Sequence, residues 1–326
     1  MAREGANLIQ QIGVQSVAGT PVAATKRFAS IAIDVGADIV TKQFRSHGAK
    51  QVTTSILHKN MSSGRFEGPL SYNELIYVLA GLASTTVNTV TGVSTWTHSP
   101  SPIGADSFKY YTLEQGDDED TEQYKDLQFT SLDISWGLED VMMSGAVFAK
   151  TKATLGSLSG GVSILAERPV SARDITIYAD TTFGGIGVTA LTDPFDAKLS
   201  LGEKFSPKWV LNKTQTSYKE PFERISDKTF TMTIEAGSQA RTLLSDLLAG
   251  NGRFFRVKAE DGEIPSSTPS TNFTIQFDFY AKLSQVREIK DYQDALFAYE
   301  LTFVLIQEAN LNAPYTAVVK NNLTAL

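Results

Sequence analysis

The chain has 326 residues, 42% of them hydrophobic and 20% charged, an ordinary balance for a folded protein long enough to form two domains. The absence of cysteine excludes disulfides and thiolate chemistry, and three scattered histidines are too few for a zinc site. The formal net charge of −7 argues against a surface that grips nucleic acid, because phosphate binding requires an excess of Lys and Arg.

A short segment near the N-terminus has the most recognisable local pattern. Residues 13–28 read Gly-Val-Gln-Ser-Val-Ala-Gly-Thr-Pro-Val-Ala-Ala-Thr-Lys-Arg-Phe, in which a glutamine precedes a turn of small residues and a basic pair then opens a strand. This pattern resembles the N-terminus of the tail tube (major tail) proteins of long-tailed bacteriophages. The residues alone also allow a simpler interpretation, in which Gly19-Thr20-Pro21 only forms a turn.

Members of that family of similar length are mostly β, acidic and poor in cysteine. The resemblance therefore implies a structural virion protein that is not an enzyme and carries no cofactor or metal. Such a protein forms rings that stack into the tail tube, through which DNA passes without specific binding. Its other implied partners are tail proteins such as the tape measure, distal tail and terminator proteins. It would be assembled in the host cytoplasm, reside in the virion tail and bind no membrane.

Two strands, one early in each half, are each followed by a polar segment rich in basic residues. A strand at 31–40 precedes the segment 41–50, and a strand at 197–201 precedes the segment 204–224. In tail tube proteins this connection contacts neighbouring subunits, so the resemblance implies intersubunit contacts in both segments. A solvated hairpin is the alternative, although an aromatic ring among lysines suits an interface. The candidate contact residues are Lys42, Arg45, Lys208 and Trp209.

Two helical segments occupy corresponding positions in the two halves. Residues 71–81 and 240–250 each place leucines at helical spacing and end in a glycine, where a left-handed C-terminal cap is expected. The two glycines are 169 residues apart (250 − 81), and so are the matching leucines. The matching positions are Leu75, Leu79 and Gly81 in the first segment and Leu244, Leu248 and Gly250 in the second. A period of half the chain predicts a duplication, not a solenoid repeat.

Strands are expected on both sides of each helix, in the same order in each half. Before the helices they lie at 51–57, 61–66 and 228–234, and after them at 129–136, 141–150, 273–282 and 296–306. The pattern predicts a mainly β chain of two tandem β-sandwich- or barrel-like domains, each with one short flanking helix. The predicted domains are residues 1–160 and 161–326, joined within a glycine-rich segment at 151–187. Chance similarity of two generic αβ segments is the alternative.

Residues 82–123 are expected to form a long loop inserted in the first domain, since the corresponding connection at 251–272 is about half as long. Its aromatic residues exceed what a solvated loop would keep, which makes Trp96, Tyr110 and Tyr111 further candidates for intersubunit contacts. An acidic run at its end lacks the spacing of a calcium loop. We interpret that run as a solvated turn, or as an acidic patch facing a polyanion.

Two expected strands alternate apolar and polar residues, so that each has one packed and one polar face. Asp133 lies on the polar face of the strand in the first half, and Asp278 on that of the strand in the second half. If these polar faces line the channel of a tube, the two aspartates are the leading lumen-facing candidates. A plain solvent-facing strand is the alternative for both.

The sequence contains no recognisable catalytic pattern. No glycine cluster has the spacing of a phosphate-binding loop, and Leu158 occupies the serine position of a nucleophile elbow. No apolar run reaches the ~18 residues of a membrane span, and the N-terminal segment lacks the apolar core of a signal peptide, so we expect folding in a cytoplasm.

Two alternative functions remain open from sequence. Another tail ring protein, such as a distal tail or terminator protein, would share the fold. A carbohydrate-binding or hydrolytic β-sandwich could use Trp96 and Trp209 against a sugar with Asp117 and Glu119 as paired carboxylates. For the tail tube interpretation, six domains around the axis would require three chains in each ring.

Overall fold

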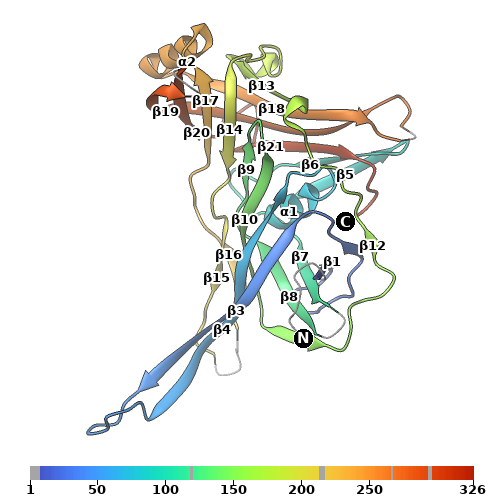
Figure 1. Cartoon of the computed structure of the whole chain (residues 1–326), viewed down its shortest axis with the longest axis vertical. Coiled ribbons are helices and arrows are strands. Elements are labelled where there is room, and N and C mark those ends of the chain that lie inside the picture. Colours follow the sequence, from blue (N-terminus) through green and yellow to red (C-terminus); the bar gives the residue numbers. More distant parts are fainter. Residues whose placement is uncertain (1–7, 118–119, 213–216, 266, 293–295) are drawn as a thin grey trace.

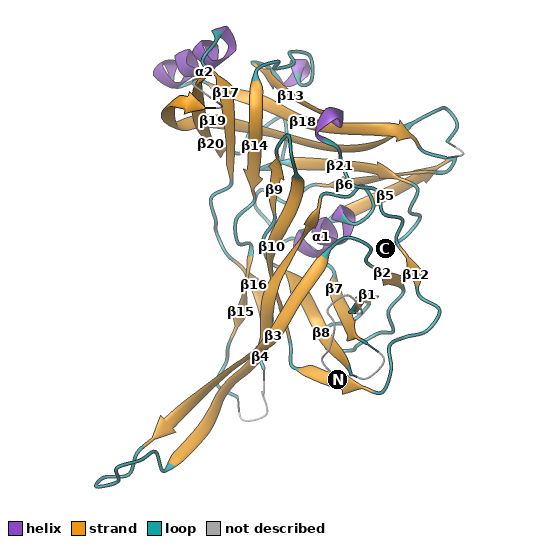
Figure 2. Ribbon diagram, viewed as in Figure 1, coloured by secondary structure: helices purple, strands orange, loops and turns teal. Residues whose placement is uncertain are grey.

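The structure is a computed structural model that describes residues 8–117, 120–212, 217–265, 267–292 and 296–326. It is mainly β, and the helices α1 (Leu75–Leu82) and α2 (Ser238–Ala249) lie at the middle and the top of the view in Figure 2. Short 3-10 turns lie at Ala172–Asp174 and Phe183–Gly185. The mainly β class expected from the alternating sequence is confirmed.

The longest sheet crosses both halves of the chain. Its order is β3 (Ala32–Phe44), β4 (Thr54–Pro69), β10 (Val141–Ala149), β9 (Asp133–Trp136), β14 (Pro194–Ser200), β17 (Thr229–Glu235), β20 (Leu296–Leu305) and β19 (Asn272–Tyr292). Every neighbouring pair is antiparallel. We call this the eight-stranded sheet.

A second sheet packs against it and shares one strand with it. Its order is β13 (Ile175–Asp180), β18 (Gly252–Glu263), the first part of β19, β21 (Thr316–Asn321), β6 (Val93–His98) and β5 (Thr85–Val90). The strand β19 has 21 residues, so its first part pairs with β18 and β21 while its last part pairs with β20. This strand therefore joins the two sheets.

The N-terminal strands form a third layer beneath α1, at the lower right of Figure 1. The order is β12 (Ser163–Ile164), β2 (Lys26–Arg27), β1 (Ile9–Gln15), β7 (Tyr110–Gly116), β8 (Thr121–Phe129) and β11 (Lys152–Leu155). The end of β8 also pairs with β10, which connects this layer to the eight-stranded sheet. A separate hairpin consists of β15 (Phe205–Lys208) and β16 (Glu220–Glu223).

The helix α1 is buried on every side. This is expected because a helix whose residues are apolar all around its axis has no polar face to turn to solvent. Gly81 lies inside this helix, and Ala83 follows its end, so the expected left-handed cap at Gly81 is wrong. The reason is packing, because a Cβ on Gly81 would stand 2.7 Å from the ring of Phe129. Gly250 after α2 has a φ of 70°, and the cap expected there is confirmed.

Residues 82–123 are not a loop, which corrects that expectation. They contain β5, β6 and β7 and the start of β8. Threonine-rich sequence favours strands as well as turns. The strand β6 pairs with β5 in a local hairpin around Thr91 and Gly92, and on its other side with β21, which follows more than 200 residues later. No local pattern could reveal the pairing with β21.

The two halves share one core in the part of the chain that is described. Trp136 of the first half packs edge-on against Phe277 of the second, with ring centroids 6.3 Å apart, and Tyr72 lies 6.0 Å from Phe273. The large buried apolar side chains of both halves form one continuous cluster. The structure thus shows a β-rich body and gives no separate cores for residues 1–160 and 161–326.

Candidate assembly surface

The eight-stranded sheet contains the same strand order twice. In chain order the first half supplies β3, β4, β9 and β10, and the sheet arranges them as β3-β4-β10-β9. The second half supplies β14, β17, β19 and β20, arranged as β14-β17-β20-β19. A helix follows the second strand in both sets. Each half therefore places four strands by one scheme.

The two sets join through β9 and β14. Ser135 pairs with Lys198 and Asp133 with Ser200, so the last strand of the first set lies antiparallel beside the first strand of the second. Asp133 is about one-third exposed, and its carboxylate lies 3.6 Å from the ammonium group of Lys198. We call this pairing the internal junction.

One face of the eight-stranded sheet covers the core, and the other is mostly polar except near β10, where Phe148 and Met61 pack against the β15–β16 hairpin. Directly opposite residues share a face in an antiparallel pair, so the registers place a row of hydroxyl and charged side chains on the polar side, which we call the open face. Its acidic residues are Asp34, Asp38, Glu67, Asp133, Asp196, Glu235 and Glu300. Its basic residues are Lys59, Arg65, Lys198, Lys282 and Arg287. Acidic groups outnumber basic groups on this face.

Asp278 does not lie beside Asp133. It stands on the first part of β19, opposite Thr316 of β21, in the second sheet. Its side chain is buried, and its two oxygens accept from the guanidinium group of Arg256 at 2.7 and 2.9 Å. The amide of Gln276 donates to it at 2.8 Å. The alternation in sequence could not separate these aspartates, because every strand with one packed face shows the same pattern.

The outer edge of β3 is covered only where it lies against the body. The side-chain amide of Gln10 donates to the carbonyl of Ile33 at 2.6 Å and accepts from its N–H at 2.8 Å. The hydroxyl of Tyr124 donates to the carbonyl of Val35 at 3.1 Å. Beyond Val35, no strand among the described residues pairs with β3 except β4. The backbone N–H and C=O groups of the odd-numbered residues that follow on β3 therefore point away from β4, as those of Ile33 and Val35 do.

The other end of the sheet is the last part of β19. Residues 283–292 pair with β20 on one side. On the other side the pairing with β18 reaches only as far as Lys282. Among the described residues no strand continues on that side. Nearly all of residues 284–292 are exposed or half-exposed. Both ends of the sheet thus present backbone hydrogen-bonding groups, which is a template for pairing with another chain.

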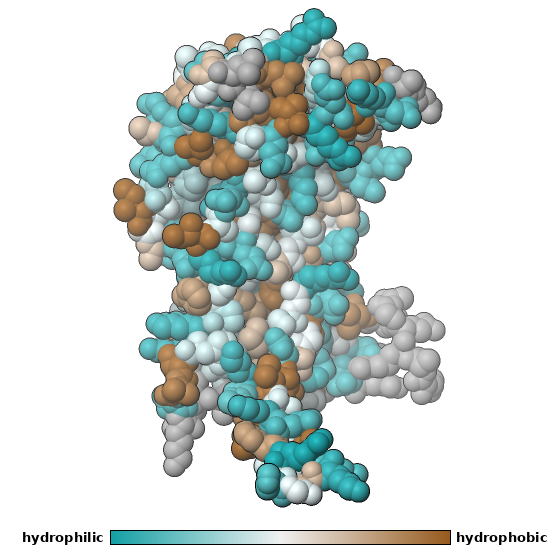
Figure 3. Space-filling view, turned by 90° about the vertical axis from the view of Figure 1, so that its left-hand side faces the viewer, coloured by the Kyte–Doolittle hydropathy of each residue, from teal (hydrophilic) through white to brown (hydrophobic). Residues whose placement is uncertain are grey.

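The hairpin of β3 and β4 projects far from the body, at the lower left of Figure 1. Lys42 and Arg45 lie on this arm and are exposed. The arm also exposes apolar side chains, Ile39 at 53% and Leu57 at 54% among them. Figure 3 shows apolar side chains among polar ones along the narrow lower part of the molecule, where the arm lies. A charged arm with exposed aliphatic residues suits a contact surface.

The β15–β16 hairpin lies beside the base of the arm. Lys208 forms an ion pair with Glu220 at 2.8 Å, and Trp209 lies under the ammonium group of Lys59, 5.0 Å from the ring centroid. Phe148, Phe205 and Tyr218 form a small buried cluster between this hairpin and β10. The structure therefore brings both predicted basic segments to one end of the molecule.

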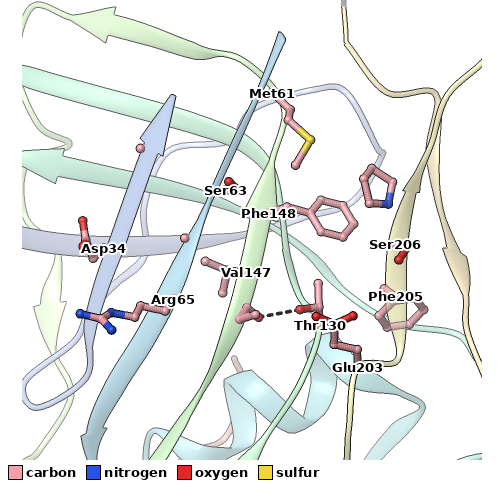
Figure 4. A pocket seen from close by; sticks show the side chains of 14 residues that line it. Asp34, Met61, Ser63, Arg65, Thr130, Val147, Phe148, Glu203, Phe205 and Ser206 are labelled. Carbon is pink, nitrogen blue, oxygen red and sulfur yellow. Dashed lines mark hydrogen bonds between the residues drawn. The ribbon is translucent and has the colours of Figure 1, made fainter. Parts of the chain in front are cut away.

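A groove of about 660 Å³ runs between the base of the arm, β10 and β15. Asp34 and Arg65 line one end and the rings of Phe148 and Phe205 the other, as Figure 4 shows. The hydroxyl of Thr130 donates to the carbonyl of Ala146 at 3.0 Å between them. The lining is open and mixed in character, which suits a contact between surfaces more than an enclosed substrate site.

Two of the other aromatic residues predicted to make contacts lie in the core, and the third, Tyr110, lies near the β15–β16 hairpin, because Phe108 packs against both Tyr110 and Phe205. Trp96 is buried, and its indole N–H donates to Asn321 at 2.9 Å. Tyr111 is fully buried and its hydroxyl donates to the carbonyl of Tyr77 at 2.7 Å. Trp96 and Tyr111 are therefore core residues, which corrects their assignment to a surface loop. Tyr110 is half-buried and packs against Phe108.

The side chains considered for other chemistry are not assembled into a site. Burial of Trp96 removes it from any stacking on a sugar, and Glu119 lies outside the described residues. His98 is buried between Tyr315 and Thr85, and burial lowers its pKa to about 3. No group of three or more potential metal ligands occurs among the described residues.

Nor does the described part of the chain contain a helix with the length and apolarity to cross a membrane. A comparison of the sequence with protein-family models and with curated protein sequences finds no match.

Proposed function

We propose that this protein is a structural subunit that pairs edge to edge with copies of itself to form closed rings, which stack into a tube. The observation that carries the proposal is the eight-stranded sheet, in which one four-strand scheme occurs twice. The internal junction already joins the fourth strand of one set to the first strand of the next. The open edges of the chain are again a first strand, β3, and a fourth strand, β19.

The strand directions permit this assembly. Eight consecutive antiparallel strands leave the two edges running in opposite directions, so the last part of β19 meets β3 of the next chain antiparallel, as β9 meets β14. A head-to-tail contact of this kind generates a ring when the rotation closes. Closure also removes both exposed edges, which would otherwise promote aggregation.

The two four-strand sets support the view that the chain arose as two tandem tail-tube-like domains with a shared core. Six such units around an axis correspond to three chains. The resemblance of residues 13–28 to tail tube proteins of long-tailed bacteriophages favours the same assembly, located in the virion tail. The open face would then line the channel, and its excess of acidic groups would let DNA pass without being held. No catalytic side chain or cofactor is needed for this role.

In this arrangement the arm extends from the ring toward the next ring, because it continues β3 and β4 beyond the sheet. The tape measure, distal tail and terminator proteins would be the other partners. A related ring protein of the tail would share the fold and differ in forming one ring only. Long tubes formed by the purified chain alone would favour the tube subunit.

The proposal can be tested by removing one hydrogen-bond donor at the free edge. The N–H of Ile39 faces outward on β3, so Ile39→Pro leaves the β3–β4 ladder intact while it blocks edge pairing. We expect this variant to melt like the wild type and to remain monomeric. Ile39→Thr is the matched control, because it reduces the apolar surface but keeps the N–H. Assembly of Ile39→Pro into normal tubes would contradict the proposal.

A further inference from the structure

A groove of about 370 Å³ lies at the end of the eight-stranded sheet that is opposite the arm. The arm continues the start of β4, whereas Pro69 at the end of β4 pairs with Met142 at the start of β10. The turn between β9 and β10 therefore lies at the far end of the sheet from the arm, near the top of Figure 1. The start of β14 lies beside the same turn, because Ala197 pairs with Trp136. We call this cavity the end groove.

The lining of the end groove is mainly apolar. The β9–β10 turn, β13 and the start of β14 supply Trp136, Leu138, Ile175, Leu191, Pro194 and Phe195. Leu138 is 71% exposed although it borders this cavity. An exposed leucine beside an apolar groove is typical of a surface that a protein partner covers.

Acidic side chains surround the end groove. Glu139 and Asp140 lie in the β9–β10 turn, and Asp196 on β14 lines the groove itself. Asp193 precedes β14, and its carbonyl accepts from the N–H of Glu235 at the end of β17. None of these five carboxylates forms an ion pair with a described residue. The rim of an apolar groove thus carries unpaired negative charge.

The basic residues at this end do not cancel that charge. The ammonium group of Lys198 lies 3.6 Å from Asp133, and Arg173 is followed by an acidic residue in the same short turn. The last part of β19 is balanced, with two basic and two acidic residues among 287–291. Arg241 is exposed on α2. Acidic groups therefore outnumber basic groups around the end groove.

The arm has the opposite charge. Asp38 stands at its base, and from there to Glu67 the chain contains no acidic residue. The basic residues of the projecting part are Lys42, Arg45, Lys50 and Lys59. None of these four forms an ion pair with a described residue, whereas Lys208 and Arg224 of the neighbouring hairpin segment are paired with glutamates at 2.8 and 2.6 Å. The positive charge of the arm is thus available to a partner.

The tip of the arm also exposes apolar side chains. Phe44 is 44% and Val52 is 46% exposed, and they lie on the two sides of the terminal turn. The ammonium group of Lys42 lies 5.5 Å from the ring centroid of Phe44. The tip therefore combines unpaired positive charge with apolar surface, and the end groove combines unpaired negative charge with an apolar cavity.

We infer that the end groove is the surface that receives the arm tip of a second copy of this chain, in the next ring of the stack. This inference deepens the proposed function and rests on it. The arm does not reach the end groove of its own chain, because the two lie at opposite ends of one sheet. The contact is therefore head to tail, and such a contact repeats along a tube.

A second copy fits the arm better than a nucleic acid does. Phosphate groups would attract the basic residues of the arm. They would leave the apolar side chains of the arm and of the end groove exposed, whereas the contact between copies buries both. The excess of acidic groups in the rest of the chain would also repel a polyanion.

The test reverses the charge on each side of the contact and follows stacking. Lys42→Glu with Arg45→Glu, and separately Glu139→Lys with Asp140→Lys, should leave the rings intact. Each pair should raise the concentration at which half of the rings are stacked by roughly tenfold, since one exposed ion pair changes an equilibrium by up to about fivefold. The chain with all four substitutions should stack at nearly the wild-type concentration. High salt should diminish these differences.

Mixing shows whether the contact is made between copies. Preformed rings of the arm variant and of the groove variant should stack with each other, because each arm then meets a groove of opposite charge. Phe44→Ser should weaken stacking at low and at high salt alike, since it removes apolar surface and no charge.

Lys26→Glu with Lys320→Glu is the matched control for the arm variant. It makes the same change of net charge on β2 and β21, away from the arm and the end groove. Circular dichroism and thermal melting establish that each variant is folded, and sedimentation velocity separates chains, rings and tubes.

Normal stacking of both charge variants would overturn this inference and leave the proposed rings standing. Normal tubes from an arm variant that no longer binds a labelled DNA duplex would assign the arm to nucleic acid and would also overturn it. A wild-type chain that remains monomeric at all concentrations would overturn the inference and the proposed function together.

Discussion

Asp133 of β9 and Lys198 of β14 form an ion pair, 3.6 Å apart, across the pairing that joins the first half of the chain to the second. The halves are therefore connected by a continuous sheet as well as by a linker. An edge-to-edge contact made once within the chain is, in our proposal, made again between chains.

The packing around α1 makes a prediction about stability. Gly81→Ala should lower the free energy of unfolding by about 1–3 kcal/mol, because the added methyl group would stand 2.7 Å from the ring of Phe129 in a filled core. Chemical denaturation measures the change. Gly156→Ala is the control, since a Cβ there meets no atom within 4 Å and should leave stability nearly unchanged. Equal stability of both variants would show that α1 and β8 can separate at low cost.

Burial of His98 makes a prediction about pH. The pKa of this histidine is lowered from 6.5 to about 3 by burial, with a smaller contribution from the charge of Lys204. The unfolded chain therefore binds a proton below pH 6.5 that the folded chain does not bind until about pH 3. The stabilisation present above pH 6.5 should be lost progressively as the pH falls through this window.

The measurement for His98 is the free energy of unfolding of the wild type and of His98→Gln at several pH values. The difference between the two curves isolates the histidine from the carboxylates that titrate in the same range. His98→Gln should be less stable at pH 7, because it replaces a buried ring bonded to Tyr315. Its stability should fall less steeply between pH 6.5 and 4, and parallel curves would contradict a neutral buried histidine.

The arm makes a prediction that separates folding from stacking. All of residues 44–54 at its tip except Ala49 are exposed, and Gln43 pairs with Ser55. Replacing residues 44–54 by a two-residue Asn-Gly turn therefore keeps the register and should leave the melting temperature within a few degrees of the wild type. If the arm contacts the next ring, the shortened chain should form single rings and no tubes. Electron microscopy of equal concentrations gives the comparison. Tubes of normal length from the shortened chain would show that the arm is not needed for stacking.

The open face makes a prediction about DNA. Replacing Asp133 and Asp196 by Lys would reverse its excess of acidic charge, and assembled tubes of this variant should retain duplex DNA in a manner that weakens with salt. Wild-type tubes should retain little. Co-sedimentation of tubes with a short labelled duplex at several salt concentrations measures both. Equal, weak retention by the two kinds of tube would show that the open face does not line the channel.

Many of the strands could be predicted from sequence, because alternation of apolar and polar residues indicates a strand with one buried face. The strands expected at 141–150, 228–234 and 296–306 match β10, β17 and β20 closely. The helix positions were also predicted, since leucine spacing shows the helical period. The cap at Gly81 was wrong because a glycine that permits close packing and a glycine that ends a helix look the same in sequence.

The pairing of distant strands could not be predicted. Trp96 and Tyr111 lie on strands of two local hairpins, β5–β6 and β7–β8, although the sequence predicts a loop there. Threonine- and serine-rich sequence is compatible with strands as well as loops, and the second partner of β6, β21, comes from the far end of the chain and has no local signal. Asp278 was grouped with Asp133 because alternation gives the face of a strand but not the sheet to which it belongs. The two free edges, on β3 and on the last part of β19, had no signal in sequence, since a free edge depends on which strands lie at the ends of the sheet.

The central claim is that three chains close a ring through the free edges of β3 and β19. Cryo-electron microscopy of the purified protein, with symmetry determined from end-on views and averaged rings, tests it most directly. We expect rings of three chains with an approximate sixfold appearance, in which β19 of each chain lies antiparallel beside β3 of the next. Rings of six chains, or assemblies in which these two strands remain apart, would contradict the account.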